Sequence, residues 1–101
     1  MRILIFLTPT NKTGTKQAYT RLRKFLFSDG YVLIGIEQYM RVVQSRKNVD
    51  KYLQKLHAYN PGTGVIRILV LTEKQYRGII YLTGEPDQQE KTVGSNYYIL
   101  L

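Results

Sequence analysis

The sequence predicts an α+β fold in which a four-stranded antiparallel sheet carries two helices on one face. Three observations lead to this prediction. Apolar runs typical of strands alternate with segments of helical spacing, in the order strand, helix, strand, strand, helix, strand. The chain has 101 residues, which is enough for a single hydrophobic core. Hydrophobic residues make up 44% and charged residues 22% of the chain, as in ordinary globular domains.

The first strand is predicted from a continuous apolar run over residues 3–7, which indicates burial on both faces. Pro9 ends this strand because proline cannot donate a hydrogen bond to a sheet. A polar loop then leads to a helix over residues 16–27, which ends at Asp29-Gly30. The apolar stripe of this helix consists of Ala18, Leu22, Phe25 and Leu26.

Two short strands follow, over residues 31–34 and 39–43. Helical spacing returns over residues 48–59, and Asn48 is a suitable residue to cap the beginning of that helix. The two helices therefore flank the second and third strands in the chain.

The fourth strand is predicted over residues 65–71. Thr72 and Gln75 have the spacing of a capping box, so a short helical turn should follow the strand. Another short strand is predicted over residues 79–82.

This order of elements is the ferredoxin-like βαββαβ arrangement. We divide the chain into a ferredoxin-like domain (residues 1–83), a polar linker (84–96) and an additional C-terminal strand (97–101). The last strand could extend its own sheet or pair with the exposed sheet edge of a second copy. A disordered tail is the alternative. The candidate interface residues are Tyr97, Tyr98, Ile99, Leu100 and Leu101.

The net charge of +8 is unevenly distributed along the chain. Residues 1–28 hold six basic residues and no acid, whereas residues 29–101 hold nine basic and seven acidic residues. Lysines on a helix are usually a solvated face. Here the first helix has no acid for i,i+4 pairing and carries arginines, which match phosphate geometry. This pattern predicts a nucleic-acid-binding surface made of Lys12, Lys16, Arg21, Arg23 and Lys24.

Several classes of site are excluded by composition. The chain has no cysteine, which excludes disulfides, thiolate zinc sites and cysteine nucleophiles. His57 is the single histidine, so one chain cannot form a multi-histidine metal site. No apolar run approaches the ~20 residues of a membrane span, and the N-terminus lacks a signal-peptide cleavage site. We expect a cytoplasmic protein that contacts no membrane.

Several short segments, in the right order and spacing, carry a resemblance to a known family. They are Met1–Phe6, Ala18–Leu26, Asp29–Tyr31, Tyr39 with Arg41, and Val70–Tyr76. With these segments the chain resembles CRISPR-associated protein 2, the small subunit of the spacer-acquisition machinery. The resemblance implies a homodimer that bridges dimers of the CRISPR-associated protein 1 integrase and binds double-stranded prespacer DNA.

One position departs from the family pattern. The family usually has an aspartate at the end of the first strand, proposed as the metal ligand of a nuclease activity. Thr8 holds that position here, or Thr10 if the register is shifted at the proline, and a threonine hydroxyl is a weak ligand for Mg²⁺. We therefore expect no catalytic residue, no metal ligand and no cofactor, and a non-catalytic architectural subunit.

Two alternatives remain open. One is a metal-dependent endonuclease, acting on RNA or DNA, which would require Mg²⁺ and a carboxylate cluster supplied through the fold or by a partner chain. The other is an unrelated ferredoxin-like RNA-binding module. That class exposes aromatic residues on its central strands, and the strand over residues 65–71 has none.

Overall fold

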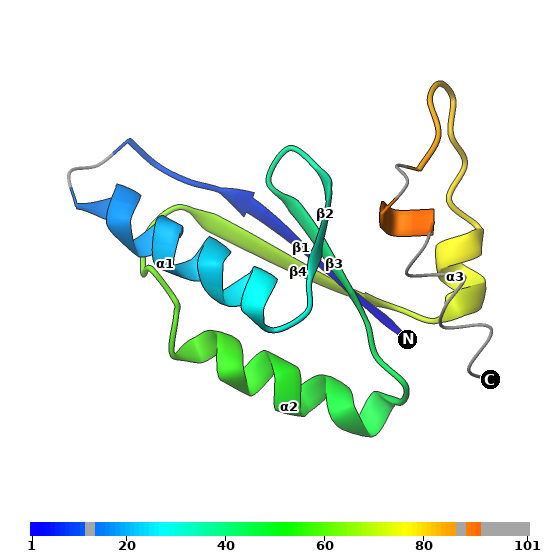
Figure 1. Ribbon diagram of the computed structural model, residues 1–101, viewed down its shortest axis with the longest axis horizontal. Helices are drawn as coiled ribbons and strands as arrows, with labels where there is room; N and C mark the ends of the chain where they lie inside the picture. Colours follow the sequence, from blue (N-terminus) through cyan, green and yellow to red (C-terminus); the bar gives the residue numbers. More distant parts are fainter. Residues whose placement is uncertain (12–13, 87–88, 92–101) are drawn as a thin grey trace.

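The computed structural model describes residues 1–11, 14–86 and 89–91 (Figure 1). Its strands are β1 (Arg2–Thr8), β2 (Val32–Gly35), β3 (Gln38–Val42) and β4 (Val65–Leu71). Its helices are α1 (Thr15–Ser28), α2 (Arg46–His57) and α3 (Glu73–Arg77). The strands form one antiparallel sheet in the order β2-β3-β1-β4. The predicted α+β, ferredoxin-like βαββαβ arrangement is confirmed.

Strand β1 is central and is buried on both faces, as its continuous apolar run predicts. Ile3 and Ile5 point to the helices and are 0% and 1% exposed. Leu4 points to the opposite face, where it packs with Met40 of β3. Because side chains alternate along a strand, a run without polar residues can fill both sides of a sheet.

Both long helices cover the same face of the sheet, and they lie side by side (Figure 1). Helix α1 buries Tyr19, Leu22 and Leu26 against the sheet. Helix α2 buries Val49 and Leu56 in the same core. Each helix therefore turns its polar face to solvent, which is the arrangement that apolar residues at helical spacing dictate.

The other face of the sheet has a smaller core. Its buried cluster consists of Leu4, Val32 and Met40. Strand β4 is an edge strand, and Val65 and Leu69 on this face are 45% and 48% exposed. This side of the sheet therefore leaves apolar surface in contact with water.

Helix α3 is held against the beginning of β1 by a buried arginine. Arg2 is 3% exposed, and its Nε and Nη2 donate to the Glu73 carboxylate at 2.7 and 3.2 Å. Its guanidinium also lies 3.7 Å from the centre of the Tyr76 ring. The capping box predicted for Thr72 and Gln75 is confirmed, with both of its hydrogen bonds present.

Two predicted elements differ from the structure. Helix α2 begins at Arg46, with Ser45 preceding it, so Asn48 does not cap it. The Asn48 N–H donates to the Ser45 carbonyl oxygen, which places Asn48 inside the first turn. Residues 79–82 do not form a strand, and Leu82 is fully exposed. Strand formation needs a neighbouring strand, and no described strand pairs with this segment.

The later part of the chain is described in part. Residues 89–91 are helical, and Glu90 is buried near Arg2, so desolvation raises the pKa of its carboxyl group. The predicted C-terminal strand over residues 97–101 lies outside the described residues. The division of the chain at residues 83 and 96 stays a prediction. Within the described part, none of the helices combines the length and hydrophobicity needed to cross a membrane.

A glycine before β4 offers a test of this packing. Gly64 has φ +75°, and an added Cβ would press on the Tyr19 hydroxyl and the Thr8 carbonyl oxygen. Gly62 has the same φ with open space around it. Gly62→Ala should lower the free energy of unfolding by about 1–2 kcal/mol, from backbone strain alone. Gly64→Ala should cost clearly more in chemical denaturation, and equal costs would contradict the close packing at Gly64.

Candidate nucleic-acid interface

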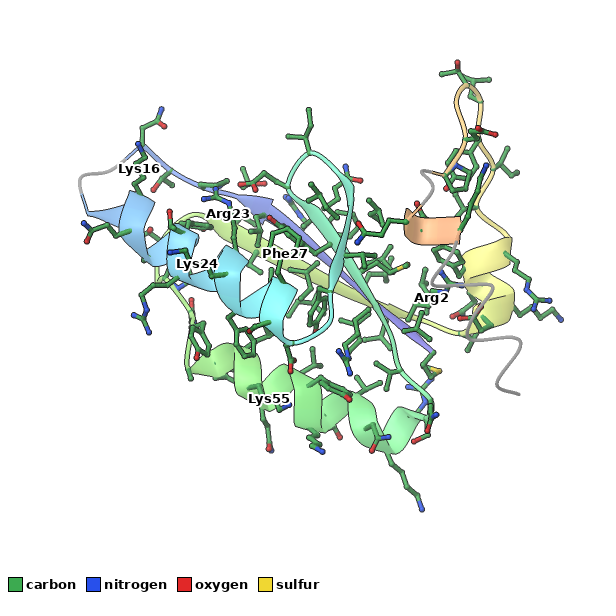
Figure 2. All side chains as sticks on the ribbon, viewed as in Figure 1. Arg2, Lys16, Arg23, Lys24, Phe27 and Lys55 are labelled. Atoms are coloured by element: carbon green, nitrogen blue, oxygen red, sulfur yellow. The ribbon has the colours of Figure 1, made fainter. Side chains whose placement is uncertain are left out.

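Helix α1 presents its cations to solvent because its apolar stripe faces the sheet. Lys16, Arg21 and Lys24 are exposed, opposite the buried Tyr19 and Leu22. Figure 2 shows Lys16 and Lys24 on this helix. The helix carries four cations and no acid, so no carboxylate within it can neutralise them. Lys12, predicted as part of the same surface, lies outside the described residues.

Arg21 is positioned beside an aromatic pair. Its guanidinium lies 5.5 Å from the centre of the Tyr59 ring, and Tyr59 stacks on Phe25 at 4.1 Å between ring centres. The stacked rings lie beside the Arg21 guanidinium, and the exposure of Arg21 leaves that group accessible to an anion.

Arg23 has a partner that the sequence did not indicate. Its Nε and Nη2 donate to the two carboxylate oxygens of Glu37 at 3.0 and 2.6 Å. This hydrogen bonding raises the pKa of the Arg23 guanidinium. Arg23 therefore differs from Lys16, Arg21 and Lys24, because its guanidinium already donates hydrogen bonds to the Glu37 carboxylate.

Glu37 is placed by the turn between β2 and β3. It has φ +57°, in the left-handed region, and its carbonyl oxygen accepts a hydrogen bond from the Leu7 N–H at 2.9 Å. The turn therefore lies against the last residues of β1. The predicted topology indicates this position of the turn, because a third strand that runs antiparallel to β1 begins beside the end of β1.

A polar hollow of about 300 Å³ lies between the end of β1 and the beginning of α1. Two cations, Lys16 and Arg23, contribute to its wall. Its other lining residues are Pro9, Thr10, Asn11, Thr15 and Tyr19. Burial raises the pKa of the Tyr19 phenol, whose hydroxyl donates to the Thr63 carbonyl oxygen at 2.5 Å. Because Arg23 is paired with Glu37, Lys16 is the lining cation that is available to an anion such as a phosphate.

The end of β1 does not fit a magnesium ion. Thr8 is exposed and offers a neutral hydroxyl, and the carboxylate of Glu37, whose backbone lies against the end of β1, is bound by Arg23. Among the described residues, no three carboxylate or imidazole side chains gather closely enough to hold a metal ion. Mg²⁺ is held mainly through carboxylate and phosphate oxygens, which this strand end does not offer in free form.

These observations define a small ferredoxin-like α+β protein with a basic outer helix. No family model matches the chain. Among curated proteins, it is 38% identical over 96 residues to the CRISPR-associated endoribonuclease Cas2 of Acidovorax ebreus, covering 94% of each chain. It is 35% identical over 85 residues to the Streptococcus mutans protein of that name, covering 84% of this chain and 79% of the relative.

A third relative agrees over nearly its whole length. The CRISPR-associated endoribonuclease Cas2 of Ligilactobacillus salivarius is 28% identical over 98 residues, covering 97% of each chain. The identity to the first two relatives and this coverage show that the chain belongs to the Cas2 family. The family resemblance of the sequence is confirmed.

The Arg23–Glu37 pair predicts an unusual effect of removing an acid. Glu37→Gln should tighten binding to a DNA duplex, because it removes a carboxylate that competes with phosphate for Arg23. If Arg23 gains one phosphate contact, the slope of log binding constant against log salt should steepen by about 0.9. Fluorescence anisotropy of a labelled duplex over a salt series measures this slope.

Glu85→Gln is the matched control, since Glu85 is 78% exposed and pairs with Lys91 far from α1 in the sequence. It changes the net charge by the same amount. Equal slopes for the two variants would show that Glu37 does not restrain Arg23.

Proposed function

We propose that this chain is a non-catalytic architectural subunit of the CRISPR adaptation complex, which binds double-stranded prespacer DNA through the phosphate backbone. The observation that carries the proposal is the exposed, acid-free row of cations on α1. Membership of the Cas2 family supplies the biological setting. Lysine and arginine contacts to phosphates give affinity without reading the base sequence.

The proposed assembly is a homodimer that bridges dimers of the CRISPR-associated protein 1 integrase. Two copies, each with a net charge of +8, would present +16 to a duplex lying across them. The exposed apolar residues of the edge strand β4, Val65 and Leu69, support pairing with another chain. The C-terminal segment 97–101 is proposed to dock partner chains by strand addition.

Within this proposal, cutting and joining of DNA belong to the integrase. The present chain holds the duplex in place through its positive charge, and this role requires no carboxylate and no metal. Thr8 at the end of β1, where an aspartate would be needed for metal-dependent chemistry, supports this division of labour.

The proposal predicts that α1 carries a large share of duplex affinity. Lys16→Glu with Lys24→Glu should weaken duplex binding at least tenfold at low salt, because both reversed charges face the phosphates. The salt dependence should become shallower by about 1.8, or about 0.9 for each lost phosphate contact. Anisotropy titrations measure both quantities.

The control is Lys74→Glu with Lys91→Glu, which makes the same change in net charge at exposed positions outside α1. Unchanged binding by the α1 variant, or an equal loss in the control, would remove α1 from the interface.

A second candidate function is metal-dependent endoribonuclease activity. The names of the relatives favour it, since all three are called endoribonucleases. One structural observation is compatible with it, because the fold brings Glu37 to the end of β1. The activity would require Glu37 to leave Arg23, or a carboxylate from a partner chain, before a metal ion could bind.

The two candidates predict opposite results in one assay. With single-stranded RNA and Mg²⁺ or Mn²⁺, we expect the purified protein to cleave no faster than a sample containing EDTA, because Thr8 is a poor metal ligand. Cleavage that survives further purification, stops with EDTA, and falls at least tenfold in Glu37→Gln but not in Glu85→Gln would establish the second candidate.

A further inference from the structure

A second basic surface lies on α2 and belongs to none of the sites described above. This helix carries four cations and a single acid, Asp50, and all five side chains are exposed. The cations are Arg46, Lys47, Lys51 and Lys55. Together with the four cations of α1, they place eight of the fifteen basic residues of the chain on two neighbouring helices.

The spacing of the lysines places them in a row. Lys47, Lys51 and Lys55 follow one another at four-residue intervals, so each lies about 6 Å further along the helix axis. The opposite side of α2 carries Val49 and Leu56, which are buried in the core. The row therefore points away from the sheet, and we call these three lysines the α2 row.

Internal ion pairing reaches one end of the α2 row. Lys55 Nζ lies 3.2 Å from the Asp29 carboxylate, at the end of α1. Lys47 and Lys51 form no ion pair with any described residue. Asp50 follows Arg46 by four residues and Lys47 by three, so it lies next to both of them on the helix surface. Lys47 and Lys51, four residues apart, repel each other, and a bound anion would relieve that repulsion.

The helix that carries the α2 row lies beside α1. The two helices lie side by side on one face of the sheet, and Figure 2 shows Lys24 on α1 and Lys55 on the adjacent α2. Helix α1 contributes a charge of +4 and α2 a charge of +3, against +8 for the whole chain. The outer surface of the helices therefore forms a broad positive field, which suits an extended polyanion.

We propose that the α2 row is a second phosphate-binding surface, on which Lys47 and Lys51 contact the sugar-phosphate backbone of a nucleic-acid duplex. The inference rests on the proposed function for the class of ligand, and it adds a helix that the proposed function does not use. Binding there is independent of base sequence, because lysine is a point charge without the geometry for base readout.

Four variants test the proposal in anisotropy titrations of a labelled DNA duplex over a salt series. Lys47→Gln with Lys51→Gln should weaken binding and make the salt dependence shallower by about 1.8. Lys47→Arg with Lys51→Arg should keep the wild-type slope, since both charges remain. Lys74→Gln with Lys91→Gln removes two exposed charges elsewhere and should also keep it. The fourth variant, Lys16→Gln with Lys24→Gln, reports on α1 separately.

The outcomes separate this inference from the proposed function. A wild-type slope in the Lys47, Lys51 glutamine variant, with a shallower slope in the α1 variant, would overturn the inference and leave the α1 interface standing. A shallower slope in the Lys47, Lys51 glutamine variant, with a wild-type slope in the α1 variant, would support the α2 row and remove α1 from the interface. Glutamine and lysine have similar helix propensities, so α2 should stay folded in every variant, which circular dichroism checks.

Discussion

Burial of β1 on both faces is the constraint on which the rest of the structure depends. A central strand with no polar residue between Ile3 and Leu7 requires apolar cover on both sides of the sheet. The helices provide that cover on one side, and only a small cluster around Met40 provides it on the other. Cations cannot enter such an interior without a partner, as Arg2 shows by its pairing with Glu73. The cations of α1 and α2 other than Arg23 are therefore exposed, and the helix side of the molecule is basic.

The pairing of β1 with β3 also determines which side chains meet at the C-terminal end of β1. Because β3 runs antiparallel to β1, the turn before β3 must lie beside the last residues of β1. This position brings Glu37 next to α1, the helix that follows β1. Arg23 and Glu37 then satisfy each other's charge in a half-buried position. The Arg23–Glu37 pair therefore bears on both metal binding and phosphate binding. The carboxylate is less available to a metal ion, and the guanidinium is less available to a phosphate.

Local patterns predict the parts of the fold that local interactions decide. The apolar run of β1 and the capping box at Thr72 each depend on a few neighbouring residues, and both are correct. The stripe predicted for α1 is correct at Leu22 and Leu26, whereas Ala18 and Phe25 are only partly buried and Tyr19 is buried. The strand over residues 79–82 is wrong because strand formation depends on a partner, which its apolar residues cannot specify. The Arg23–Glu37 pair joins residues fourteen positions apart, so no helical or strand spacing indicates it. The α2 row escapes notice when residues 29–101 are summed, because acids elsewhere in that range offset its lysines.

The distribution of acids also bears on whether the chain holds nucleic acid or cuts it. Metal-dependent hydrolysis needs carboxylates that are free, close together and fixed in position. Here Asp29, Glu37, Glu73 and Glu85 each form an ion pair within the described residues. Backbone binding makes a weaker demand, since exposed lysines on stable helices suffice and their positions need not be exact to an ångström. Such exposed lysines are present on α1 and on α2. Four of the described acids take part in internal ion pairs, and the exposed cations of α1 and α2 face the solvent that a polyanion would displace.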